Sequence, residues 1–199
     1  MKNNLSLSFL GLTALLLVSC SKLPQTEIDL ANAAIEETKA AGAETYAHDN
    51  FITLQDSMNR VMVNLEVQKS KLLKNYTSVV EGLSGVTGFA HEVKLETENR
   101  KAELKNEIQK TIAEVKTLIE TNKQLILEAP KGKEGATALV AMQGELDSIE
   151  AAINEASTML ESGDYLATLD KARAAKEKAY SINTELTEVI AKYKGNVKN

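Results

Sequence analysis

The side chains best suited to chemistry are one cysteine and two histidines. Each histidine precedes an acidic residue, as His48-Asp49 and His91-Glu92. Such pairs could assemble a zinc or general-base site across helices, but tetrahedral zinc needs three or four converging ligands and no H-E-x-x-H spacing occurs. Both histidines fall at predicted helix junctions, where solvated or capping roles are ordinary. We therefore expect no metal site and no catalytic role for either histidine.

Glycines and carboxylates offer two further chemistries, and neither pattern is complete. Gly82, Gly85 and Gly88 are spaced like a phosphate-binding loop, but such loops follow a strand and continue with Gly-Lys-Ser/Thr or G-x-G-x-x-G. We interpret them as a flexible hinge between two long helices. The glutamates of residues 92–114 alternate with lysines and arginines, which predicts a solvated, ion-paired face and no facing pair of glycosidase carboxylates. The chain is thus predicted to be no enzyme and to bind no cofactor.

The charge balance argues against nucleic acid as a partner. The 199 residues include 23 Lys+Arg and 28 Asp+Glu, for a formal net charge of −5. No stripe of basic residues is present to displace the counterions of a phosphate backbone. The single cysteine, Cys20, also excludes a disulfide framework.

The first twenty residues carry the strongest signal in the chain. After a short positive opening, the apolar run from Leu5 to Val18 is shorter than the roughly 20 residues that cross a bilayer, and it is typical of an export signal. The run ends in Leu17-Val18-Ser19-Cys20, which resembles a bacterial lipobox. The Cys20 thiol is a nucleophile that can accept a diacylglycerol, and Ser19 is small enough to admit a peptidase. We predict a lipoprotein signal peptide over residues 1–19 and a palmitate-bearing membrane anchor at Cys20; the alternative is a free cysteine in an ordinary signal peptide or weak membrane helix.

The residues after the cysteine bear on location. Ser21 stands where inner-membrane lipoproteins have Asp, and this pattern resembles lipoproteins that are passed on to the outer membrane. No acidic run follows immediately to signal transfer to the cell surface. In a bacterium with two membranes, these features predict an outer-membrane lipoprotein that faces the periplasm. Residues 20–25 would form its lipidated tether.

From residue 26 onward, apolar residues recur at spacings of three and four, which predicts helices. One such stripe consists of Leu139, Met142, Leu146, Ile149 and Ile153. Glycine and proline mark the breaks at Gly42, Gly82–Gly88, Pro130–Gly135, Gly163 and Gly195. The pattern predicts an all-α fold, an elongated antiparallel and coiled-coil-like bundle of about five helices. It would form one domain over residues 26–195 with a tail at 196–199, and its core would be a narrow seam with little room for a ligand.

Two helix junctions share a glycine and a following tyrosine. Gly42 and Tyr46 lie in one, and Gly163-Asp164-Tyr165 forms the other. In each, we expect the glycine to end a helix and the tyrosine ring to cover the end of the core, while Asp164 can cap the next helix. These junctions resemble those of alanine-rich bacterial envelope lipoproteins of unknown function. The resemblance covers residues 26–66 and 137–190, which makes 67–136 an apparent helix-lengthening insertion, and it implies fold and location without any activity.

Two triplets leave a modification open. Asp56-Ser57-Met58 and Asp147-Ser148-Ile149 match the Asp-Ser-hydrophobic pattern that one bacterial phylum O-glycosylates. Three-residue patterns arise often by chance, and the Met and Ile already belong to the predicted core stripes.

These features predict a lipid-anchored, non-enzymatic envelope protein that acts as a structural or protein-interaction module. Its partners would be the membrane, through the covalent lipid, and an envelope protein that the sequence does not identify. A different class of function stays open, in which the chain is a periplasmic carrier or chaperone-like binder of lipid or unfolded chains. The adaptable contacts would then be Met58, Met62, Met142 and Met159.

Overall fold

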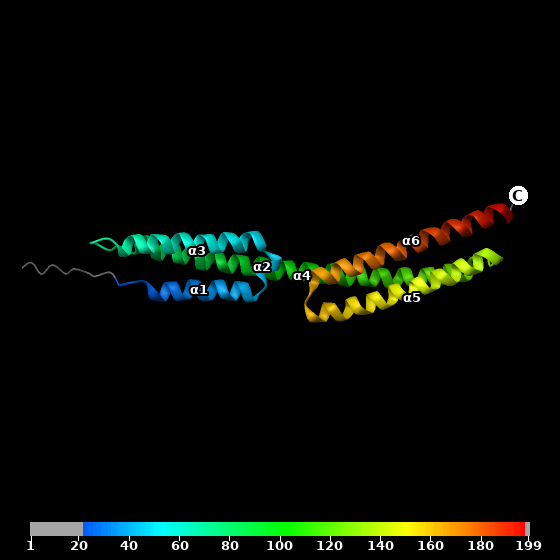
Figure 1. Cartoon of the computed structure of the whole chain (residues 1–199), viewed down its shortest axis with the longest axis horizontal. Helices are drawn as coiled ribbons and strands as arrows, with labels where there is room; N and C mark the ends of the chain where they lie inside the picture. The colour runs from blue at the N-terminus through cyan, green and yellow to red at the C-terminus, as the bar shows by residue number, and fades with distance from the viewer. Residues whose placement is uncertain (1–21, 198–199) are drawn as a thin grey trace, which may run out of the picture.

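One helix runs the length of the molecule, and all the others pack along it. The computed structural model describes residues 22–197, which contain helices and no strand. The central helix, α4, has 52 residues, Thr77–Glu128, and at 1.5 Å per residue it is about 78 Å long. Beside its first half lie α1 (Gln25–Ala40), α2 (Ala43–Tyr46) and α3 (His48–Lys69), and beside its second half lie α5 (Lys133–Ser162) and α6 (Tyr165–Val197) (Figure 1). The prediction of an elongated all-α fold of about five helices is confirmed, the sixth being the single turn α2.

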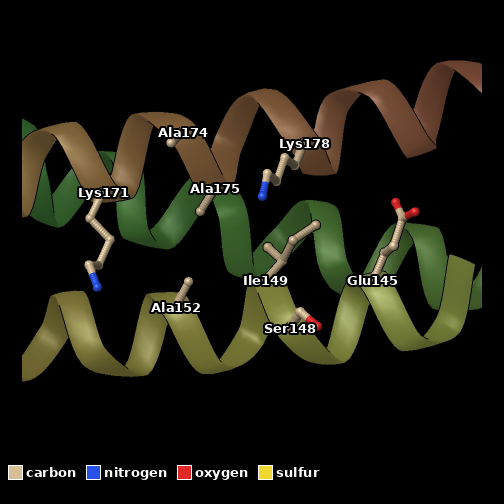
Figure 2. Close-up of a pocket in the computed structure, with 8 residues that line it drawn as sticks. All are labelled: Glu145, Ser148, Ile149, Ala152, Lys171, Ala174, Ala175 and Lys178. Atoms are coloured by element: carbon tan, nitrogen blue, oxygen red, sulfur yellow. The ribbon is translucent and has the colours of Figure 1, made fainter.

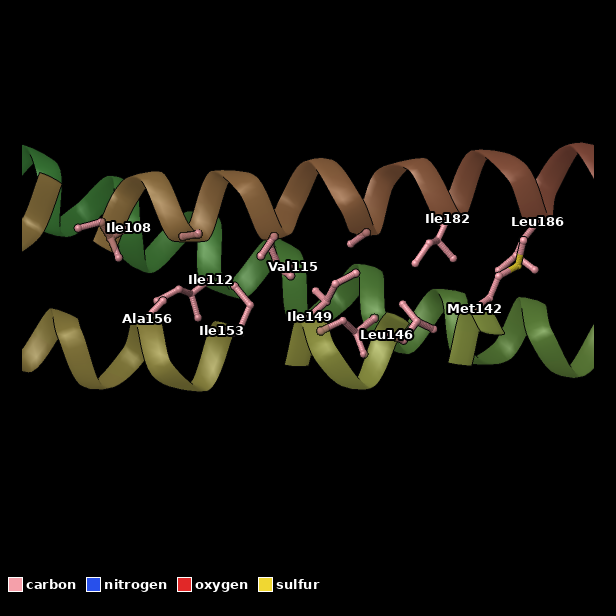
Figure 3. Packing of buried hydrophobic residues seen from close by; sticks show 14 of the residues in the cluster. Ile108, Ile112, Val115, Met142, Leu146, Ile149, Ile153, Ala156, Ile182 and Leu186 are labelled. Atoms are coloured by element: carbon pink, nitrogen blue, oxygen red, sulfur yellow. The ribbon is translucent and has the colours of Figure 1, made fainter. Parts of the chain in front are cut away.

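The core is divided into two clusters, one on each half of α4. The N-terminal bundle consists of α1, α3 and the first half of α4, and its buried side chains run from Ile28 to Val93. The C-terminal bundle consists of the second half of α4 with α5 and α6, and its buried side chains run from Leu104 to Ile190 (Figure 3). Residues 26–195, predicted as a single bundle, thus carry two clusters on one shared helix, and α6 continues past 195 to Val197.

Two buried polar side chains fix the position of neighbouring helices along α4. The Thr38 hydroxyl of α1 donates to the carbonyl oxygen of Ala90 at 2.9 Å. In the other bundle, Asn122 Nδ2 donates to the carbonyl oxygen of Ala179 at 2.7 Å, and Asn122 Oδ1 accepts from Asn183 Nδ2 at 2.8 Å. Sliding α6 along α4 by one turn would leave the buried Asn122 amide without its partners, which is costly, whereas sliding α1 would break only the contact between helices, because the Thr38 hydroxyl also bonds to Ala34 in its own helix at 2.8 Å. These bonds therefore set the register of α1 and α6 against α4.

The predicted hinge at Gly82, Gly85 and Gly88 is wrong, because all three glycines lie inside α4. The apolar stripe passes through them without interruption, and its buried members here are Val79, Leu83, Val86 and Ala90. Packing of this stripe against α1 and α3 outweighs the low helix propensity of glycine. At position 82 glycine is also favoured for a steric reason, because a Cβ there would come within 2.8 Å of Val61 Cγ2 on α3. Glycine at this position lets the two helices approach closely.

The actual break before α4 is the loop Ser70–Tyr76, which contains neither glycine nor proline. Tyr76 is buried in the N-terminal core, and Asn75 Oδ1 accepts a hydrogen bond from the backbone N–H of Thr77 at 2.9 Å. These contacts hold the end of the loop and supply a partner for one free amide of the first turn. The chain therefore reverses direction here without glycine or proline, the residues that usually indicate a turn.

Alanine substitution separates the packing role of Gly82 from the helix propensity of Gly85. A Cβ at Gly85 meets nothing within 4 Å, so Gly85→Ala should raise the free energy of unfolding by about 0.5–1 kcal/mol. Gly82→Ala should be neutral or destabilising, because its Cβ collides with Val61. Urea unfolding followed by circular dichroism measures both variants. Equal stabilisation by the two substitutions would contradict the close approach of α3 to α4.

Candidate functional site

Two left-handed turns face the middle of α4 from opposite directions (Figure 1). Gly42 follows α1 with a φ of 97°, and Gly163 follows α5 with a φ of 86°. A side chain is strained in this conformation, so glycine is favoured where each helix ends. Asp164 Oδ1 accepts a hydrogen bond from the backbone N–H of Ala167 at 3.4 Å, at the start of α6. The structure thus places both glycines and Asp164 at helix ends.

Tyr46 and Tyr165 meet between these turns. Their ring centroids are 6.1 Å apart with planes inclined by 52°, a tilted arrangement within the usual range for aromatic pairs. The hydroxyl of Tyr46 donates to the carbonyl oxygen of Gly163 at 3.2 Å. Tyr46 belongs to α2 but packs against the C-terminal core, as Tyr165 does. The two tyrosines therefore join one bundle to the other, a contact that their spacing in the sequence does not reveal.

Lys101 of α4 completes this contact. Its Nζ donates to the carbonyl oxygen of Ala41 at 3.0 Å and lies 5.7 Å from the centroid of the Tyr46 ring, within range of a cation–π interaction. We call Tyr46, Lys101, Gly163 and Tyr165 the central junction. It contains hydrogen bonds, a ring contact and one cation, and no arrangement of nucleophile and base. The arrangement can couple the two bundles mechanically.

A groove of about 540 Å³ opens between α5 and α6 in the C-terminal bundle. Ile149 and Ala152 contribute from α5 and Ala175 from α6, while Lys171 and Lys178 reach across from α6 (Figure 2). The small alanines on facing helices leave this space, which the predicted narrow seam does not include. Lys171 Nζ pairs with Glu155 Oε2 at 2.5 Å, so its charge is already matched. The groove is amphipathic, with an apolar floor and a charged margin.

The four methionines considered as adaptable contacts lie elsewhere. Met58 and Met142 are buried in the two cores, and Met62 is partly buried against the N-terminal core. None of the residues that line the groove is a methionine. The facing alanines, and not the methionines, were the sequence signal that could have indicated this groove.

Neither histidine belongs to a group of side chains that could hold a metal ion within the described residues. His48 is exposed at the start of α3, and its Nδ1 lies 3.0 Å from the carbonyl oxygen of Glu44. His91 is exposed inside α4, so its predicted position at a helix junction is wrong, because that junction depended on the glycine hinge. Within residues 22–197, no three His, Cys, Asp or Glu side chains are grouped so that they could hold a metal ion.

Ion pairs between α4 and neighbouring helices lower the pKa of two carboxyl groups. The Lys176 ammonium lies 2.5 Å from Glu114, and this hydrogen bond lowers the pKa of the Glu114 carboxyl. Across the N-terminal bundle, Lys94 is 3.0 Å from Glu37 and lowers the pKa of Glu37 in the same way. Both carboxyls are thereby held in the ionised form. An acid catalyst needs the opposite shift, toward a raised pKa.

The two serines of the Asp-Ser-hydrophobic triplets lie on helices. The Ser57 hydroxyl donates to the carbonyl oxygen of Thr53 at 2.8 Å and is partly buried. The Ser148 hydroxyl donates to the carbonyl oxygen of Gly144 at 3.0 Å and is exposed beside the groove. Modification of either serine stays a prediction.

Cys20, the predicted lipidation site, lies outside the described residues. Among the helices of residues 22–197, none combines the length and apolar character that crossing a bilayer requires. The described chain begins with Lys22, just before α1. Comparison with protein-family models, curated proteins and solved structures found no match to this chain.

The tyrosine hydroxyl at the central junction has a measurable contribution to stability. Tyr46→Phe removes the hydrogen bond to Gly163 and should lower the free energy of unfolding by about 0.5–1.5 kcal/mol. Tyr180→Phe is the matched control, because Tyr180 is 64% exposed on α6, and it should change stability little. Urea unfolding followed by circular dichroism compares the two. If Tyr46→Phe lowers the free energy of unfolding no more than Tyr180→Phe does, the Tyr46 hydroxyl does not contribute to the coupling between bundles.

Proposed function

We propose that this chain is a lipid-anchored, non-enzymatic protein of the bacterial cell envelope that acts as a rigid spacer and protein-interaction module. The lipid is carried by Cys20, after removal of residues 1–19, and the protein sits on the outer membrane facing the periplasm. Its partner is an envelope protein. The resemblance to alanine-rich envelope lipoproteins agrees with this location.

The observation that carries the proposal is the position of the tether relative to α4. Gln25 begins α1 at one end of the molecule, and α4 extends from that end for about 78 Å (Figure 1). Because residues 20–25 precede α1, a lipid on Cys20 attaches to an end of the rod and leaves its length free to extend from the membrane. Several acyl chains hold such a protein to a bilayer almost permanently.

The opposite end of the rod offers a surface for a protein partner. Large apolar side chains are exposed there on three helices, namely Leu127 on α4, Val140 on α5, and Val189 and Tyr193 on α6. Exposed apolar side chains that three helices present near one end favour a contact with protein there. The tethered end and the contact end are then separated by the length of α4.

A carrier function is the second candidate, and the groove between α5 and α6 favours it. An acyl chain could lie on Ile149 and Ala152, with an anionic head group beside Lys178. Lipid that co-purifies with the protein, identified by mass spectrometry, would distinguish a carrier from a spacer. For a spacer, mass spectrometry should detect only the lipid that is covalently attached to the protein.

The anchor is tested by replacing its sulfur. Cys20→Ser should abolish labelling by radioactive palmitate and prevent normal removal of residues 1–19, because serine cannot form the thioether that precedes cleavage. Ser19→Ala keeps a small residue before the cysteine and should be labelled and processed normally. Labelling and intact mass of the protein measure both effects. A Cys20→Ser protein that matures and sediments with envelopes like the parent would overturn the anchor.

The interaction role is tested by photo-crosslinking in intact cells. Probes at Val140 and Tyr193 should form adducts with another envelope protein, because both side chains are exposed at the far end of the rod. A probe at Gln55, which is exposed on α3 in the N-terminal bundle, is the control and should form fewer adducts. If every position yields only the uncrosslinked monomer, the chain has no protein partner at this end.

A further inference from the structure

The loop Ser70–Tyr76 presents two leucines that the protein itself leaves uncovered. Leu72 is 103% exposed and Leu73 is 85% exposed, whereas every other exposed large apolar side chain of the described chain is 73% exposed or less. The loop is nevertheless well held, since Tyr76 is buried and Asn75 bonds to the start of α4. Exposing two adjacent leucines to water is unfavourable, so an ordered loop that does so favours contact with an apolar surface outside the protein.

This loop lies at the tethered end of the rod. Helices α1 and α4 run in the same direction (Figure 1), and Thr38 of α1 bonds to Ala90 of α4. Gln25 and Thr77 lie 13 residues before these two residues, respectively, so the two helices begin at about the same level. The loop immediately precedes Thr77, and Figure 1 shows it at the same end as the start of α1. Cys20 is two residues before Lys22, and two residues span at most about 7 Å. An acyl chain on Cys20 would therefore bring the bilayer to the loop.

The charge of this segment suits a bilayer with anionic head groups. Residues 69–76 contain Lys69, Lys71 and Lys74 and no Asp or Glu, although the whole chain has a net charge of −5. Glu66 pairs with Lys69 at 2.8 Å, and Lys71 lies next to the leucines. Lysines beside exposed leucines match a lipid surface, in which cations meet head groups and apolar side chains reach the acyl boundary.

We propose that the loop Ser70–Tyr76 is a second membrane contact, in which Leu72 and Leu73 enter the lipid surface beside the acylated Cys20. The inference rests on the proposed lipid anchor and adds to it. A chain tied through a short tether alone can swivel about that tether. Two contacts at one end of a rigid helix restrict this motion and set the direction in which the rod leaves the membrane.

The test uses the full, lipidated chain in vesicles of phosphatidylethanolamine and phosphatidylglycerol. Cys20 is the only cysteine, and its sulfur is blocked by lipid, so Leu72→Cys provides a unique thiol for an environment-sensitive fluorophore. The matched control is Val140→Cys, whose parent side chain is 73% exposed at the far end of the rod. Emission at position 72 should shift to shorter wavelength and be quenched by lipids with brominated acyl chains. Emission at position 140 should show neither effect.

A second substitution tests the charge. In the Leu72→Cys background, Lys71→Glu should reduce quenching by brominated lipid in anionic vesicles, because it places a carboxylate beside anionic head groups. In vesicles of phosphatidylcholine alone, the same substitution should change quenching less. Equal effects in the two kinds of vesicle would overturn the role of head-group charge in this contact.

The other outcomes separate this inference from the anchor. If mass spectrometry finds the lipid on Cys20 but probes at 72 and 140 respond alike, the anchor stands and the membrane contact is overturned. A blue shift at position 72 without quenching by brominated lipid means that protein covers the leucines, which also overturns it. Absence of lipid on Cys20 overturns the proposed function and the inference together.

Discussion

The structure depends on the burial of one face of α4 along both of its halves. Each bundle is built from one half of α4 and two further helices, so both cores share this one helix. An isolated helix is marginal in water, so a 52-residue helix persists because packing buries its apolar stripe in both bundles. The same packing explains why three glycines in its first half do not break it. The rod shape follows directly, because two cores in line on one straight axis cannot form a compact sphere.

The central junction restrains α4 where it passes from one core to the other. Between Val93 and Leu104 the apolar core is interrupted, and a helix without neighbours there would be free to bend. Tyr46 connects the turn of the N-terminal bundle to Gly163 in the turn of the C-terminal bundle, and Lys101 holds the N-terminal turn on α4 through Ala41. Within α4, the buried Thr97 hydroxyl donates to the carbonyl oxygen of Val93 at 2.7 Å. The left-handed glycines matter because only tight turns bring both hairpins close enough to α4 to meet. Local backbone geometry thus supports stiffness over the whole length.

Periodicity predicted most of the fold, and the failures share one cause. Spacings of three and four identified the helices, and Gly42, Gly163 and Asp164 lie at helix ends as their residue types indicate. The break at Ser70–Tyr76 and the continuity through Gly82 depend on contacts between helices, which no local rule contains. The meeting of Tyr46 with Tyr165 and the groove of facing alanines are tertiary in the same sense. The type of a residue predicted its own backbone conformation, whereas the residues it contacts depend on how the helices pack and could not be predicted locally.

The surface of the rod differs between its sides and its tethered end. Along the sides, cross-helix pairs such as Lys176–Glu114 and Lys123–Glu150 keep lysines and glutamates interleaved on the surface. Exposed pairs of this kind add little to stability, but an evenly charged surface resists association with other proteins. The uncovered leucines lie at one end, and several exposed apolar side chains lie near the other. A rod whose two most exposed leucines lie at one end, and whose sides carry ion pairs, is suited to meet a surface through that end.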